Sequence, residues 1–203
     1  MVMRWCFLIV AIFAVPAWAS DAPEHPRVSQ VEAESMGRKL DSIKQTVPPA
    51  KGKKPRESVT VTEGEVNSYL NLTYAAKLPS GLSDVAVSFD TERIHARGLL
   101  DLERVRDKMP DQSPFSPLSL LRGKVPVELT GRFTTRDGMG FFEPEEASIS
   151  SVPVPISLLD QIISSATTTA TAPNGVNIHE PFHLPYGMKR IRLVVARASL
   201  DWN

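Results

Sequence analysis

Residues 125–138 read V-P-V-E-L-T-G-R-F-T-T-R-D-G, and this stretch gives the clearest indication of the architecture. Apolar and polar side chains alternate along it, which is the two-residue period of a strand with one buried face. Asp137-Gly138 then predicts a tight hairpin, because both residues tolerate positive φ. The following segment, 141–152, is therefore expected to return as an antiparallel partner. The apolar members of the stretch are Val125, Val127, Leu129 and Phe133.

Further strands are predicted on both sides of this hairpin. Residues 85–89 and 94–100 alternate in the same way, and Asp90-Thr91-Glu92-Arg93 between them predicts a second hairpin. Residues 189–202 read as one long closing strand. Its apolar residues change parity near Val194, which predicts a bulge or burial on both faces.

Helical patterns complete the expected fold. A short strand at 59–61 is followed by Thr62-x-x-Glu65, a capping box that predicts a helix from about 63 to 72. A second amphipathic helix is expected after Pro155, which suits a first helical turn. We therefore expect an α+β fold, in which a long curved antiparallel sheet of about six strands carries two or three helices on its concave face.

The first nineteen residues have the pattern of a cleavable signal peptide. Arg4 supplies the positive charge, residues 5–15 form the apolar run, and Ala17-Trp18-Ala19 predicts cleavage before Ser20. A transmembrane anchor would need about 20 apolar residues, roughly twice this run. We therefore expect export to the periplasm or the extracellular space. Removal of the peptide takes away Cys6, the only cysteine, so no disulfide is expected.

Residues 20–57 are expected to form a helix and a linker, separate from a single domain at 58–203. The helix is predicted by apolar residues at three- and four-residue steps, and Pro48-Pro49 ends it. The linker is basic: its cations either contact anionic lipid headgroups or belong to a solvated connector. A net charge of +0 argues against nucleic acid as a partner. The cations are Lys51, Lys53, Lys54 and Arg56.

No catalytic residues, metal site or cofactor are predicted. His179-Glu180-Pro181-Phe182-His183 matches the H-E-x-x-H pattern of zinc proteases. That chemistry needs a helix to place both histidines on one face, and Pro181 and Pro185 oppose a helix here. We therefore expect a protein that is not an enzyme, with a hydrolase as a remote alternative.

The order of motifs from residue 58 onward is similar to that of a known group. Residues 59–70 combine a strand, a capping box and a helix, and Leu78-Pro79-Ser80-Gly81-Leu82 leads into the strand that ends at Asp90. Ile94-His95-Ala96-Arg97-Gly98-Leu99-Leu100-Asp101-Leu102 follows. This order resembles exported bacterial proteins with a tubular lipid-binding half-barrel. The resemblance implies a curved sheet that wraps a helix and holds an acyl chain.

Two interpretations of the apolar sheet face remain open. The helices either fill the core completely, as in a structural or partner-binding envelope protein, or leave an apolar groove for one hydrocarbon chain. For the second case the expected ligand is a lipid or another hydrophobic small molecule. The candidate ligand-binding residues are Tyr69, Leu70, Val85, Val87, Phe89, Val127, Leu129, Phe133, Leu159 and Ile163.

Overall fold

The computed structural model describes residues 27–45, 58–79, 81–106, 122–168 and 173–202. The expected signal peptide and the basic residues Lys51, Lys53, Lys54 and Arg56 lie outside these ranges. Among the described helices, none combines the length and the apolar content that a membrane span requires. The fold is α+β, as the sequence predicts.

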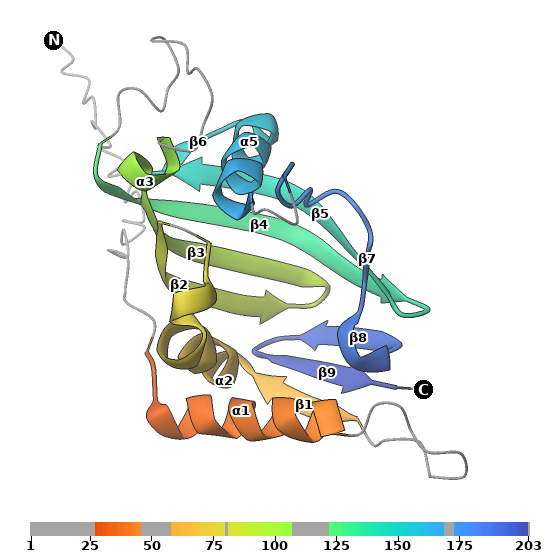
Figure 1. Cartoon of the computed structure of the whole chain (residues 1–203). Coiled ribbons are helices and arrows are strands. Elements are labelled where there is room, and N and C mark those ends of the chain that lie inside the picture. The colour runs from red at the N-terminus through yellow and green to blue at the C-terminus, as the bar shows by residue number, and fades with distance from the viewer. Residues whose placement is uncertain (1–26, 46–57, 80, 107–121, 169–172, 203) are drawn as a thin grey trace, which may run out of the picture.

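The larger sheet is six-stranded and antiparallel, with neighbouring strands in the order β2-β3-β4-β5-β6 and the short β7 paired with β5 (Figure 1). Both predicted hairpins are confirmed. Thr91 and Glu92 join β2 to β3, while Asp137 and Gly138 join β4 to β5 with φ values of 52° and 82°. The strands are β2 (Leu82–Asp90), β3 (Arg93–Asp101), β4 (Lys124–Arg136), β5 (Met139–Ile149), β6 (Val152–Pro153) and β7 (Phe182–His183).

A second, three-stranded sheet has the order β1-β9-β8 and consists of β1 (Val59–Thr62), β8 (Arg190–Val194) and β9 (Arg197–Asp201). The expectation of one long strand at 189–202 is wrong. The chain reverses at Val195 and Ala196, and Ala196 has a φ of 62°. The change of parity near Val194 therefore comes from a hairpin rather than from a bulge.

The helices are α1 (Gln30–Gln45), α2 (Glu63–Ser68), the π-helical turn η1 (Tyr69–Thr73), the short 3₁₀ turns η2 (Ala75–Lys77) and η3 (Pro185–Gly187), α3 (Leu102–Arg106) and α5 (Ile156–Thr167). The predicted capping box is confirmed. The Thr62 hydroxyl accepts a hydrogen bond from the Glu65 amide at 3.2 Å, and the Glu65 carboxylate accepts one from the Thr62 amide at 3.0 Å. Helix α5 begins after Pro155, as expected.

Helix α2 and η1 lie along the edge of β2 (Figure 1). The Asn67 side chain accepts from the Val87 amide at 2.7 Å and donates to the Val87 carbonyl at 2.9 Å. Asn71, about one helical turn further along the chain, makes the same pair of hydrogen bonds with the Val85 amide and carbonyl, at 3.0 and 2.6 Å. Unpaired strand edges invite association with other chains, and these side chains satisfy the edge of β2 instead.

Helix α1 packs onto this assembly and contributes to its core. Ile43 is only 1% exposed and belongs to a buried apolar cluster. Ser35 and Lys39 each hydrogen-bond the carboxylate of Glu65 at 2.6 Å. Burial raises the pKa of Glu65, but hydrogen bonds from Lys39, Ser35 and the Thr62 amide outweigh it and hold the pKa below its ordinary value. Helix α1, which the sequence analysis sets apart from the domain at 58–203, therefore packs against residues of that domain.

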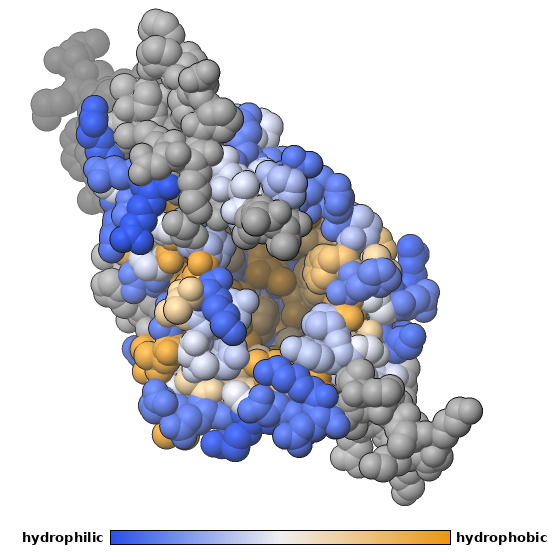
Figure 2. All heavy atoms as spheres, in the orientation of Figure 1, coloured by the Kyte–Doolittle hydropathy of each residue, from blue (hydrophilic) through white to orange (hydrophobic). Residues whose placement is uncertain are grey.

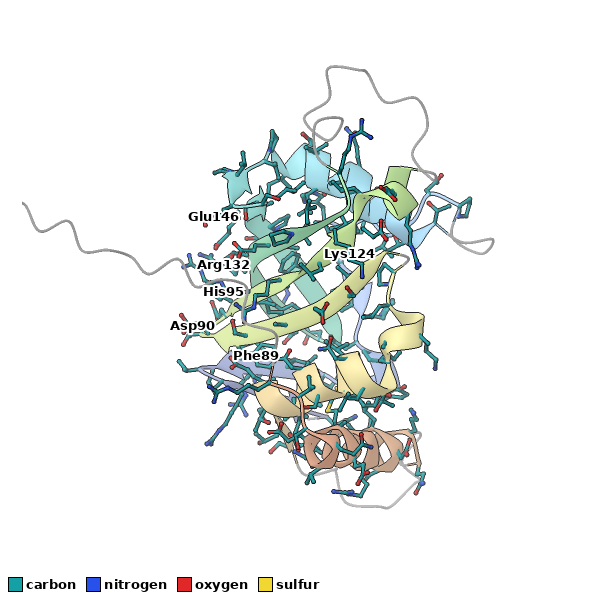
Figure 3. All side chains as sticks on the ribbon, turned by 90° about the vertical axis from the view of Figure 1, so that its left-hand side faces the viewer. Phe89, Asp90, His95, Lys124, Arg132 and Glu146 are labelled. Atoms are coloured by element: carbon teal, nitrogen blue, oxygen red, sulfur yellow. The ribbon has the colours of Figure 1, made fainter. Side chains whose placement is uncertain are left out.

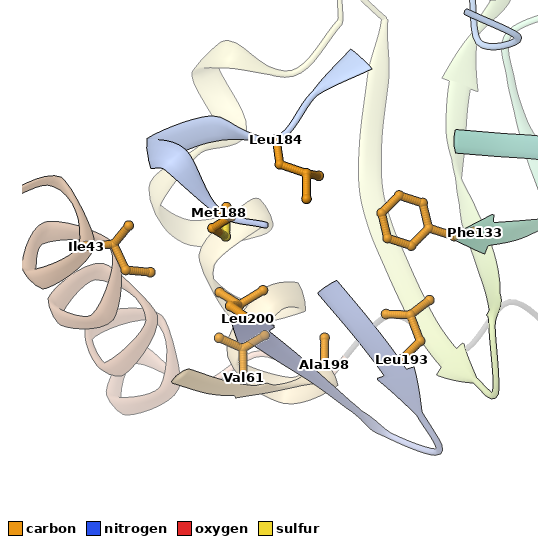
Figure 4. Close-up of a cluster of buried hydrophobic side chains, with 8 residues drawn as sticks. All are labelled: Ile43, Val61, Phe133, Leu184, Met188, Leu193, Ala198 and Leu200. Carbon is orange, nitrogen blue, oxygen red and sulfur yellow. The ribbon is translucent and has the colours of Figure 1, made fainter. Parts of the chain in front are cut away.

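Buried side chains form two clusters at opposite ends of β4. The two-sheet cluster joins the small sheet, α1 and the far end of β4 (Figure 4), and consists of Ile43, Val61, Phe133, Leu184, Met188, Leu193, Ala198 and Leu200. The α5 cluster lies beneath α5 and consists of Leu100, Leu102, Val125, Ile149 and Ile162. The part of the sheet between the two clusters contributes to neither of them, so we examine it as the candidate ligand-binding region.

Candidate functional site

On the inner face of the large sheet, the apolar side chains of β3 and β4 are covered less completely between the two clusters than at them. Val125 of the α5 cluster and Phe133 of the two-sheet cluster are buried. Between them, Leu129 and its cross-strand partner Ala96 belong to neither cluster and are only half-buried. Figure 2 shows a recess with apolar walls near the centre of one face of the molecule.

An apolar pocket of about 170 Å³ lies between this part of the sheet and α5. Its floor is formed by β2, β3 and β4, and its roof by α5. Half of the residues predicted to bind ligand line it, namely Val85, Val127, Leu129, Leu159 and Ile163. Of these, Val85, Val127 and Leu129 lie on strands, and the alternation of apolar and polar side chains predicts that they face inward.

The other predicted residues lie elsewhere. Val87 lies on β2 opposite Ala96 and does not line the pocket. Phe133 belongs to the two-sheet cluster, and Phe89 packs against that cluster. Tyr69 and Leu70 lie in η1, which contacts α1 and the edge of β2. Neither residue lines the pocket, which is covered by α5. Asn67 and Asn71, four residues apart, hold η1 and α2 at the edge of β2, because both side chains hydrogen-bond its backbone.

Small residues on β3 leave the space that the pocket occupies. Ala96 and Gly98 line the floor where the neighbouring strand carries Leu129 and Val127. A bulge in β2, with Asp84 at a φ of 51°, allows both Leu82 and Val85 to reach this floor despite their odd spacing. A Cβ atom at Gly98 would lie 3.0 Å from Leu82 Cδ1, so the lining is already close at that point. Sequence reasoning missed Leu82, Ala96, Gly98 and Ile162.

The size of the pocket limits what it can hold. Sites for drug-sized ligands usually have volumes of about 300–1,000 Å³. An aliphatic cavity of roughly 150 Å³ stays dry and binds a benzene-sized molecule. The pocket here, at about 170 Å³, therefore suits the end of a hydrocarbon chain or a small ring.

Charged residues lie on the outer face of the same strands. Arg97 and Glu128 are at the border of the pocket, but they are exposed and alternate in sequence with the floor residues. On this outer face the His95 ring nitrogen Nδ1 lies 3.0 Å from the Thr130 hydroxyl, and the Arg93 guanidinium lies 3.1 Å from the Glu145 carboxylate. Figure 3 labels His95 on this part of the sheet. Polar groups satisfy one another across strands there, while the inner face stays apolar.

The H-E-x-x-H segment is not helical, as its prolines predict. His179 lies in a turn and its Nε2 atom is 3.0 Å from the Asp160 carboxylate, whereas His183 lies in β7. Within the described ranges, no group of three or more His, Cys, Asp or Glu side chains is arranged to hold a metal ion.

No family model, curated protein or solved structure matches the chain. The resemblance to tubular lipid-binding proteins therefore stays a prediction, and the geometry of the chain itself is the basis for a functional proposal.

Proposed function

We propose that this protein binds the hydrocarbon part of a lipid, or another hydrophobic small molecule, in the pocket between the large sheet and α5, without catalysing a reaction. The observation that carries the proposal is an apolar pocket that side chains leave unfilled between the large sheet and α5. Leu129 and Ala96 lie between two buried clusters but are themselves only half-buried.

The energetics favour an apolar occupant. Complete burial of an exposed leucine or valine side chain stabilises by about 1.5–3 kcal/mol. Val127 and Leu129 are half-buried, so a ligand that covers them gains a fraction of that amount for each. A hydrocarbon chain would obtain this gain without desolvating a charge, because the residues that form the floor are apolar.

The proposal places this binding outside the cytoplasm. Ala17-Trp18-Ala19 supports export with a mature chain that begins at Ser20. The cations Lys51, Lys53, Lys54 and Arg56 would add peripheral contacts with anionic headgroups, at about 1 kcal/mol for each cation near a charged surface.

Filling the pocket with protein tests the proposal. Ala96→Phe places a ring of about the right size in the cavity, so the denaturation midpoint should hold or rise while binding of a fluorescent fatty acyl probe is lost. His95→Phe is the matched control, because the same ring is added to the adjacent, outward-facing position of β3. The control should bind the probe as the parent does.

The filled-core alternative makes the opposite prediction. If the parent protein binds no probe and Ala96→Phe lowers the midpoint by the roughly 1–3 kcal/mol typical of overpacking, the middle of the sheet is an ordinary core. A structural or partner-binding envelope protein would then be the better description.

A further inference from the structure

The small sheet has one face in the core and one face in solvent. Leu193 of β8 and Leu200 of β9 are buried in the two-sheet cluster, and successive side chains of a strand point to opposite faces. The residues that alternate with them therefore form the solvent face, which we call the basic face. It consists of Arg190, Arg192 and Val194 on β8 with Arg197, Ser199 and Asp201 on β9.

The basic face carries three guanidinium groups and one carboxylate. Arg192 forms an ion pair with Asp201, at 3.1 Å between its Nη2 atom and a carboxylate oxygen. Arg190 and Arg197 are exposed, and within the described ranges neither forms an ion pair. The residue opposite Arg197 on the neighbouring strand is Val194 rather than an acid. Three positive charges against one negative charge leave this face with an excess of two, in a chain whose net charge is +0.

Two exposed valines lie at the tip of the β8–β9 hairpin, next to these arginines. Val194 is 51% exposed and Val195 is 70% exposed. Glycine, asparagine and aspartate are the usual residues of such turns, so turn geometry does not explain a valine there. The tip is held beside the start of α2 (Figure 1). The Ala196 amide donates to the Phe89 carbonyl at 3.1 Å, and the Ala196 carbonyl accepts from the Glu63 amide at 3.2 Å.

An apolar tip beside unpaired cations fits the surface of an anionic lipid bilayer. A soluble polyanion would pair with the arginines but leave the valines in water. A bilayer has anionic headgroups at its surface and an apolar layer beneath them, so it complements both. Arg197 lies opposite Val194, and Arg192 is two residues from Val194, about 7 Å along the strand. Long arginine side chains at these positions reach the headgroups when the tip enters the bilayer.

We propose that the protein docks on anionic membranes through the basic face, with Val194 and Val195 inserted among the lipid headgroups. Arg192 and Arg197 contact lipid phosphates around the inserted tip, and Arg190 contacts the membrane surface further along β8. This docking surface belongs to the folded domain and is distinct from the cations of the linker. It does not depend on the pocket beneath α5.

Sedimentation with lipid vesicles tests the charge part of the proposal. The protein, purified without detergent, is mixed with vesicles of phosphatidylcholine alone or of equal parts phosphatidylcholine and phosphatidylglycerol. The parent should partition more strongly onto the mixed vesicles. One cation near an anionic surface contributes about fivefold, so Arg190→Gln/Arg197→Gln should bind the mixed vesicles roughly 25-fold more weakly. Arg122→Gln/Lys124→Gln is the matched control, because it removes two exposed cations beside the α5 cluster and should bind nearly as the parent does.

A valine replacement tests insertion of the tip. Val195→Ser keeps every charge but removes the apolar contact, so it should bind the mixed vesicles about tenfold more weakly. Val31→Ser is the matched control, since Val31 on α1 is 71% exposed, and it should bind as the parent does. All of the replaced side chains are exposed, so the urea midpoints of these variants should stay close to that of the parent. The linker cations are present in every variant and do not affect the comparison.

Three results would overturn the docking proposal. The parent could fail to partition onto the mixed vesicles, or the two double variants could weaken binding equally, which would show attraction by net charge alone. Loss of binding in Arg190→Gln/Arg197→Gln together with parent-like binding in Val195→Ser would show that the tip does not enter the bilayer, as expected for a site that binds a soluble polyanion. Binding of the fluorescent acyl probe is measured in solution without vesicles, so none of these results bears on the pocket.

Discussion

Replacing Asn67 with alanine is expected to destabilise the protein by about 2–4 kcal/mol, because two hydrogen bonds to the edge of β2 are lost. Each hydrogen bond contributes about 1 kcal/mol, which gives the lower value. Leaving one of the part-buried Val87 groups unpaired where water does not reach it adds about 2 kcal/mol, which gives the upper value. Asn67→Asp keeps the size of the side chain and can still accept from the Val87 amide. Its carboxylate would oppose the Val87 carbonyl, so we expect a loss of at least half that of alanine.

Two measurements check the Asn67 prediction. The urea midpoint gives the stability change, with exposed Asn174→Ala as a control that should leave it unaltered. Amide exchange gives the location: Val87 exchange should rise by about tenfold for each 1.4 kcal/mol lost locally, and more than that of Val127 in the paired centre of the sheet. If Asn67→Ala unfolds at the parent midpoint with unchanged Val87 protection, the side chains do not hold this edge.

Other predictions concern α1 and the N-terminus. Ile43→Ala should cost about 2–5 kcal/mol in denaturation experiments, as expected for a fully buried isoleucine, while Val31→Ala on the same helix, 71% exposed, should cost almost nothing; equal effects would place α1 outside the core. Because Glu65 has a lowered pKa when folded, its stabilising effect should be complete above the ordinary carboxyl pKa of 4.5 and disappear as the pH falls through the lower folded value. Midpoints measured across that acidic range should depend less on pH in Glu65→Gln, and an unchanged dependence would refute the assignment. N-terminal sequencing of the exported protein should begin at Ser20, and a retained Met1 would contradict cleavage.

Local patterns predicted the elements whose cause is local. The Thr62 to Glu65 capping box and the Asp137-Gly138 turn each depend on a few adjacent residues, and both are confirmed. The hairpin at Val195 and Ala196 was missed because neither residue is a usual turn former. The Ala196 carbonyl accepts from the Glu63 amide, and its own amide donates to the Phe89 carbonyl, so contacts distant in sequence hold that turn.

The packing of the elements against one another is harder to predict from the sequence than the elements themselves. Apolar residues at helical spacing in α1 indicate an amphipathic helix, but they do not indicate what the helix packs against. The part-buried ion pair between Lys39 and Glu65 joins residues 26 positions apart, on either side of the basic linker. The sequence therefore gives no sign that α1 belongs to the core.

The sequence predicts only some of the residues that line the pocket, because the lining also depends on how the helices pack on the sheet. Alternation identified Val127 and Leu129 as inward-facing, but whether an inward-facing residue is covered depends on where the helices lie. Tyr69 and Leu70 were expected to cover the sheet, and Asn67 and Asn71 instead direct their helix to its edge. Ala96 is not among the candidate ligand-binding residues, because the space that its small side chain leaves matters only once α5 lies above it.

Native mass spectrometry of the protein, purified without detergent, tests the central claim most directly. The account predicts a bound species with the mass of a lipid, present in the parent and in His95→Phe and absent from Ala96→Phe. A parent protein that carries no such mass, and that also takes up no fatty acid when it is offered one, would contradict a binding site between the sheet and α5.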